Sequence, residues 1–179
     1  MRLSVYSIYE QLKKNYKNPF PQSVVKIPVY HGTARVFDKF ERGDLGFHFG
    51  NQKQANKVFR NRKNQTNFSP DKSFNIKPVW INIKKPLILP DVQGWSNPKM
   101  VANALIEKGF FDAEDWKNWQ SQFHMGDTFA FQQDILLNKM KKIIKRKGYD
   151  GIKYRNEHEG KGWSYIVFDN TQIKSIFEK

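Results

Sequence analysis

Histidines and a closely spaced pair of glutamates are the side chains of this 179-residue sequence that are best suited to acid–base or metal chemistry. The set consists of His31, His48, His124, His158, Glu157 and Glu159. No two histidines show the His-Glu-x-x-His spacing of a helical metal site, so we expect no zinc or iron centre. The chain has no cysteine, which excludes disulfides, thiolate zinc sites and a cysteine nucleophile, and a reducing cytosol fits best.

Glu157 and Glu159 stand two residues apart in the polar segment 155–163. Side chains two apart in an extended segment point the same way, so we expect both carboxylates to face one cleft. Such a pair can stabilise a developing cation and accept a proton. Phosphate-binding patterns are missing, since neither G-x-G-x-x-G nor the Walker pattern occurs. The sequence therefore predicts acid–base chemistry without a glycine-rich phosphate loop.

The elements that must position these groups in the first half of the chain follow from periodicity and from Pro and Gly. A leader helix over 4–17 ends before Pro19 and Pro21. A strand over 24–33 follows, with Pro28 at its start or on an edge. The remaining predictions are a strand over 45–50, a helix over 51–63 with Asn51 as its N-cap, a loop over 64–77, and a strand-like segment over 77–89 broken by Pro86.

The second half predicts short helices over 98–109 and 112–122 and a longer helix over 132–147. The longer helix carries one apolar stripe, and Gly148 ends it. The stripe consists of Ile135, Leu136, Met140, Ile143 and Ile144. Strands over 149–154 and 164–168 flank the polar loop 155–163, and a short segment over 170–177 closes the chain. We predict one α+β domain, with a leader at 1–25 and a core at 26–179, and no membrane-spanning segment.

Three blocks together resemble the ADP-ribosyltransferase superfamily, and within it the phage and mobile-element type found in polyvalent proteins. The blocks are YHGT at 30–33, GFHFG at 46–50 and NEHEGKGWSYIVFD at 156–169, and the segment VWINIKKPLIL is also similar. The resemblance spans roughly residues 27–176. It implies a split pair of small β-sheets around a cleft for NAD, which is a substrate, and it implies no metal.

The resemblance also implies roles for individual residues. His31 would bond an NAD ribose hydroxyl, and the backbone of Gly32 would pair with the nicotinamide amide. His48 and Phe59, eleven residues apart, would enclose the nicotinamide ring, with imidazole in place of the usual tyrosine. The wider NAD-binding set is Tyr30, His31, Gly32, Thr33, His48, Phe49, Phe59 and Ser164.

The sequence departs from the family where a glutamate usually begins the last strand, because Ser164 stands there. The candidate carboxylates are upstream, at Glu157 and Glu159. One would stabilise the sugar cation formed as nicotinamide leaves, and the other would orient or deprotonate the acceptor. Glu159 is slightly favoured for the cation.

The net charge of +14 favours a polyanionic partner, and the excess is concentrated in residues 1–90. Two basic stretches are candidates for nucleic-acid contact: Lys139 through Lys147, and the set Lys53, Lys57, Arg60, Arg62 and Lys63. The acceptor is therefore either RNA or DNA or a protein side chain. The expected setting is a toxin, phage-conflict or defence effector, with an antitoxin or immunity protein as a potential partner.

Two other functions remain open from the sequence. One is a nucleic-acid-binding module or metal-free ribonuclease toxin, with His31 or His158 as general base. The other is an NAD glycohydrolase that uses water as the acceptor in the same cleft.

Overall fold

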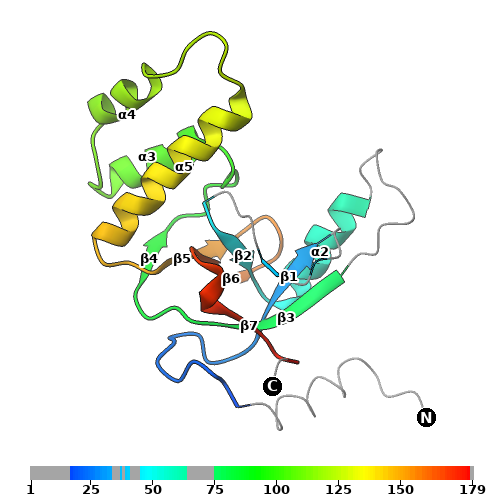
Figure 1. Ribbon diagram of the computed structural model, residues 1–179. Helices are drawn as coiled ribbons and strands as arrows, with labels where there is room; N and C mark the ends of the chain where they lie inside the picture. The colour runs from blue at the N-terminus through cyan, green and yellow to red at the C-terminus, as the bar shows by residue number, and fades with distance from the viewer. Residues whose placement is uncertain (1–16, 34–36, 38, 41–44, 64–74, 178–179) are drawn as a thin grey trace, which may run out of the picture.

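The computed structural model describes residues 17–33, 37, 39–40, 45–63 and 75–177, without the side chains at 59, 61–63 and 75. Within these residues the chain forms two β-sheets and four α-helices (Figure 1), which confirms the mixed α and β architecture. The predicted helix over 4–17 lies outside the described residues apart from its last position. Residues 17–28 contain turns and bends but no helix or strand.

The smaller sheet has the order β1-β3-β7 and is antiparallel throughout. Its strands are β1 (Val29–Thr33), β3 (Asn75–Ile81) and β7 (Ile173–Ser175). Strand β1 lies on an edge and begins directly after Pro28, so the predicted strand over 24–33 is confirmed for 29–33 and wrong for 24–28. The predicted loop over 64–77 is wrong at its end, because residues 75–77 pair with β1 inside β3. Asn75 and Lys77 are polar and leave Ile76 as a single apolar residue, so the local pattern did not indicate a strand that is defined by long-range pairing.

The larger sheet has the order β2-β6-β5-β4. Its strands are β2 (Phe47–Phe49), β4 (Pro86–Leu89), β5 (Gly151–Asn156) and β6 (Gly162–Val167). Strand β4 runs parallel to β5, and the other pairs are antiparallel. The break predicted at Pro86 is confirmed, since Pro86 opens β4 and the chain has changed sheets since β3. A parallel pair needs a long crossover, and here the helices supply it.

Helices α3 (Pro98–Glu107), α4 (Ala113–Gln120) and α5 (Phe129–Arg146) form this crossover and pack on one face of the larger sheet (Figure 1). The predicted stripe of α5 is partly wrong. Leu136, Leu137, Met140 and Ile144 are buried, whereas Ile135 is 41% exposed. The helix begins three residues earlier than predicted, and its buried face includes Leu137 in place of Ile135.

A second core lies between the two sheets. Val29 and Val79 of the smaller sheet pack there with Phe47, Phe49 and Val167 of the larger one. Helix α2 (Gln52–Lys63) contacts β1 and β3 instead, and Asn51 caps it as predicted, because its Oδ1 accepts the N–H of Gln54 at 2.9 Å. A 3-10 turn, η1 (Asn170–Gln172), leads into β7. Both sheets therefore have a packed partner layer.

Truncation of α5 distinguishes its buried face from its exposed face. Ile144 is fully buried in the helix–sheet core, so Ile144→Ala should lower the free energy of unfolding by about 2–5 kcal/mol. Ile135→Ala, on the same helix but 41% exposed, should lower it by less than about 1 kcal/mol. Urea denaturation measures both. Equal losses in the two variants would contradict the orientation of α5.

Candidate active site

The two sheets meet where β1 and β2 approach each other and then diverge. Tyr30 and Gly50 exchange both backbone hydrogen bonds, at 2.8 and 3.0 Å. One residue further along β1, the ring Nδ1 of His31 bonds the backbone carbonyl of His48 at 2.8 Å. Because a carbonyl oxygen only accepts, the proton of this contact is on Nδ1. At the point where the strands separate, a hydrogen bond from the His31 side chain thus takes the place of a backbone–backbone hydrogen bond.

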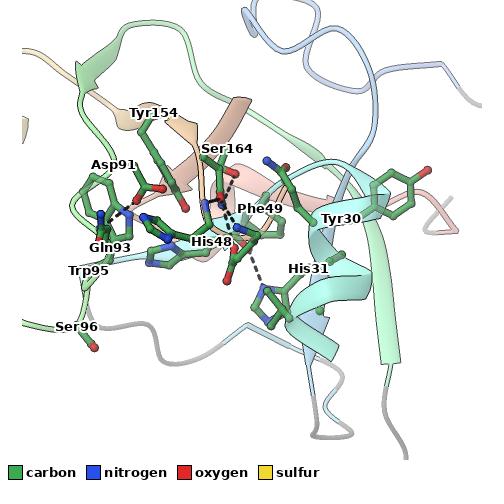
Figure 2. A pocket seen from close by; sticks show the side chains of 18 of the residues that line it. Tyr30, His31, His48, Phe49, Asp91, Gln93, Trp95, Ser96, Tyr154 and Ser164 are labelled. Atoms are coloured by element: carbon green, nitrogen blue, oxygen red, sulfur yellow. Dashed lines mark hydrogen bonds between the residues drawn. The ribbon is translucent and has the colours of Figure 1, made fainter. Parts of the chain in front are cut away.

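A cavity of about 350 Å³ opens beside this junction (Figure 2). Its walls come from β1, β2, the start of α2, the loop after β4, and the β5–β6 hairpin. Figure 2 shows Tyr30 and His31 on one side, Asp91, Gln93, Trp95 and Ser96 on the other, and Tyr154 and Ser164 between them. Several residues singled out from the sequence lie together on these walls: Tyr30, His31, Gly32, His48, Phe49, His158, Glu159 and Ser164.

Two of the predicted catalytic or NAD-binding residues that the structure describes, Thr33 and Glu157, do not lie on these walls. Thr33 is buried at the end of β1, with 4% of its surface exposed, and does not line the cavity. The side chain of Glu157 is exposed and also lies off the cavity wall. Phe59 belongs to α2, but its side chain is outside the described part of the structure. The proposed enclosure of a ring by His48 and Phe59 stays a prediction.

The two glutamates diverge because the loop between β5 and β6 is not extended. Asn156 Oδ1 accepts the backbone N–H groups of both His158 (3.1 Å) and Glu159 (2.8 Å), which folds the chain into an Asx-type turn. The alternation rule applied to the sequence assumes extended backbone, so it fails here. Only Glu159 reaches the cavity.

Asn156 is also the group that holds the carboxylate of Glu159. Its Nδ2 donates to Glu159 Oε2 at 3.0 Å and to Ser164 Oγ at 3.2 Å. With its two acceptor contacts, the amide uses both donors and both lone pairs, and only 3% of the residue is exposed. A buried polar group satisfied in this way fixes its partners, so Glu159 has a defined orientation.

Gly32 has a structural reason to be glycine that the sequence did not indicate. A Cβ added there would lie 2.5 Å from the backbone oxygen of Ala55, so any side chain would push α2 away from β1. The N–H and C=O of Tyr30 point away from β3 toward Gly50. In an antiparallel strand, alternate residues present both groups to the same edge, so the backbone of Gly32 faces the cavity where β2 has diverged.

The loop between β4 and α3 supplies a wall that the sequence analysis missed. Asp91, Gln93, Trp95 and Ser96 line the cavity from this loop. Gln93 has a φ of 59°, which is uncommon for a residue with a side chain. The Trp95 ring lies 4.7 Å from that of Tyr154 and 6.2 Å from that of His48. The sequence did contain a signal for this wall, because the dipeptides Pro90-Asp91 and Gly94-Trp95 form a loop directly after a strand.

Tyr154 is another wall residue that the sequence did not reveal. Burial raises the pKa of its hydroxyl above the ordinary value of 10.0, and the nearby carboxylates of Glu159 and Asp91 raise it further. Hydrogen bonding with Ser164 and Asn156 partly offsets this rise in pKa. The phenol therefore stays protonated and can donate a hydrogen bond at neutral pH.

The basic candidates on α2 are exposed, and one of them contacts the loop that carries Glu159. Lys53, Lys57 and Arg60 are exposed on α2, and the Lys57 ammonium donates to the backbone oxygen of His158. The side chains of Arg62 and Lys63 lie outside the described part.

On α5, several lysines bind groups of their own chain. Lys139 lies over the Trp119 ring at 4.4 Å, Lys147 over Phe110 at 5.1 Å, and Lys145 pairs with Asp169 at 2.8 Å. Because these lysines already contact their own chain, the basic stretch on α2 is the better candidate for a nucleic-acid contact.

The described residues contain no group of three His, Asp or Glu side chains that could hold a metal ion. Among these same residues, no helix has both the length and the apolar character needed to cross a membrane.

Tyr154→Phe should change the response of stability to high pH. Above the unfolded pKa of about 10, the unfolded chain releases the phenolic proton while the folded chain keeps it, so the free energy of unfolding falls as pH rises. Without the hydroxyl, this fall should be less steep above about pH 10. Denaturation at a series of pH values measures the slope. Parallel slopes in the two proteins would contradict a raised pKa at this position.

Comparison with known proteins gives one result. Residues 25–179 match the family model described as ADP-ribosyltransferase in polyvalent proteins. Neither the curated proteins nor the solved structures contain a match. The family match covers both sheets, the helical crossover and every wall of the cavity. The chain belongs to the family of ADP-ribosyltransferases in polyvalent proteins.

Proposed function

We propose that this protein transfers ADP-ribose from NAD to a macromolecular acceptor and releases nicotinamide. The family match supports the reaction class. The observation that carries the proposal is that the His31–Gly32 edge of β1 and the carboxylate of Glu159 line one cavity although they come from opposite ends of the chain.

The walls of the cavity have the chemistry that the nicotinamide riboside half of NAD requires. A volume of about 350 Å³ is within the range of small-ligand sites. The Gly32 backbone offers one donor and one acceptor, which complement a primary carboxamide. His48, Trp95 and Tyr154 offer aromatic surface for a pyridinium ring. Lys53 and Lys57 on α2 offer positive charge for the pyrophosphate.

The bond that breaks joins C1′ of the ribose to the ring nitrogen of nicotinamide. Its electron pair returns to the pyridinium, which leaves as a neutral base and needs no general acid. Positive charge then develops on C1′ and the ring oxygen, and the Glu159 carboxylate stabilises it while accepting a bond from the ribose hydroxyl. Asn156 fixes this carboxylate before the reaction begins, so little reorganisation is required.

The acceptor is nucleic acid or a protein side chain. The exposed basic residues of α2 favour nucleic acid, because Lys57 contacts the loop that carries Glu159 and helical spacing puts Lys53 and Arg60 on the same face of the helix. The biological setting proposed with this activity is a toxin, phage-conflict or defence effector. NAD labelled in its adenylate half tests the whole scheme: label on RNA, DNA or protein supports transfer, free ADP-ribose indicates a glycohydrolase, and neither product favours a nucleic-acid-binding or ribonuclease function.

Glu159→Gln should lower the rate of nicotinamide release by about 10²–10³-fold, since the neutral amide keeps the size of the side chain but cannot balance a developing cation. Chromatography of the released nicotinamide measures the rate. Glu107→Gln, at an exposed position of α3, is the matched control and should keep the parent rate. A Glu159→Gln variant with the parent rate would exclude this carboxylate from the reaction.

His31→Ala should weaken NAD binding by about 1–3 kcal/mol, or roughly 5–150-fold, because a partly buried hydrogen-bond partner is removed. Calorimetry with the Glu159→Gln background measures binding without turnover. His124→Ala changes an exposed histidine that does not line the cavity and should bind NAD as the parent does. Equal affinities in the two variants would place NAD elsewhere.

A further inference from the structure

Asp91 joins the loop after β4 to the loop that carries Glu159. Its Oδ1 accepts the backbone N–H of Gln93, and its Oδ2 accepts that of Glu157, both at 3.1 Å. The carboxylate lines the cavity and is half-buried (Figure 2). The backbone of Glu157 therefore positions an acidic group in the cavity although the side chain of Glu157 lies outside it.

Asp91 and Glu159 act on the same part of the cavity. Both carboxylates raise the pKa of the Tyr154 hydroxyl, so both lie within electrostatic range of it. They are the formally charged side chains of the described cavity lining, which includes no lysine or arginine although the chain carries a net charge of +14. Two carboxylates on one cavity wall are the arrangement that acid–base chemistry on a shared substrate requires.

The loop that carries Asp91 also contains a hydrogen-bond donor without a partner among the described residues and a residue with strained backbone. The indole N–H of Trp95 is buried without a hydrogen-bond partner among the described residues, and 92% of the residue is buried. Gln93, two residues from Asp91, is held in the left-handed region. An unpaired donor and a strained backbone on one loop that faces a cavity indicate a surface built for a ligand.

We propose that Asp91, rather than Glu157, is the second catalytic carboxylate and accepts the proton of the acceptor. The proposal rests on the transferase function proposed above. As the bond from C1′ to nicotinamide breaks and its electron pair goes to the ring nitrogen, an oxygen or nitrogen of the acceptor bonds C1′ and its proton passes to Asp91. The carboxyl group then releases this proton to water, so charge and atoms balance. The part of the wall formed by Asp91 and Gln93 becomes the acceptor side of the cavity.

Asp91→Asn is the direct test, because asparagine keeps an oxygen for one backbone N–H but cannot accept the acceptor's proton. Turnover is measured as nicotinamide release from NAD in an extract that contains RNA, DNA and protein. We expect kcat at pH 7 to fall at least 10-fold, with KM for NAD changed less than 2-fold. The kcat of the variant should rise with pH, as hydroxide replaces the missing base, where that of the parent is flat. Asp91→Glu should restore part of the lost kcat.

The other titratable groups that face this part of the cavity are Tyr154, His158 and Glu159 on β5 and its loop, His48 on β2 and His31 on β1. They are unchanged in the variant, so a new pH dependence reports on Asp91.

Asp127→Asn is the matched control. Asp127 also accepts a backbone N–H in a loop, from His124 at 2.8 Å, but lies away from the cavity. It should keep the parent kcat and pH profile. The proposal is overturned if Asp91→Asn keeps the parent kcat, or if it loses kcat with a flat pH profile and a lower melting temperature, which marks a structural turn. Failure of the proposed function is distinct, because the unmodified protein would then release no nicotinamide.

Discussion

The separation of β1 from β2 is the constraint on which the site depends. These two edge strands belong to different sheets, and they pair through the backbone bonds of Tyr30 and Gly50 before they separate. Beyond that pair, the ring of His31 bonds the His48 carbonyl, which a continued backbone ladder would have used. An edge that is left open inside a protein must find other partners for its N–H and C=O groups. Here the backbone of Gly32 faces a cavity, and in the proposed function it is the recognition surface for the carboxamide.

The acidic side of the cavity is organised by buried amide and backbone groups. Asn156 folds the β5–β6 loop through its oxygen and holds Glu159 through its nitrogen. The same loop donates a backbone N–H to Asp91, which ties the β4–α3 loop to it. Orientation is therefore fixed by short-range hydrogen bonds, while the parallel pairing of β4 with β5 brings the two loops to the same end of the sheet.

Local sequence patterns predicted the elements that they control and missed those that depend on distant partners. The strand ending in Tyr30–Thr33, the capped helix after Gly50 and the interruption at Pro86 all follow from local chemistry, and the structure contains them. Residues 75–77 read as a loop because their strand character arises only from pairing with β1. The resemblance in three blocks led to the family that the comparison then showed.

For the site, sequence reasoning placed Glu159 on the correct loop but assumed extended backbone between the glutamates, where Asn156 makes a turn. Asp91 and Tyr154 were not predicted as site residues, because no local sequence pattern links them to the blocks that contain His31 and His48. Their position follows from the register of β4, β5 and β6, which no single segment encodes.

A crystal structure with an NAD analogue that resists cleavage of the nicotinamide bond tests the central claim most directly. We expect the carboxamide on the backbone of Gly32, the nicotinamide ribose hydroxyl within hydrogen-bond distance of Glu159, and the open face of C1′ turned toward Asp91. An analogue bound with its nicotinamide outside this cavity, or with Glu159 facing the adenine half, would contradict it.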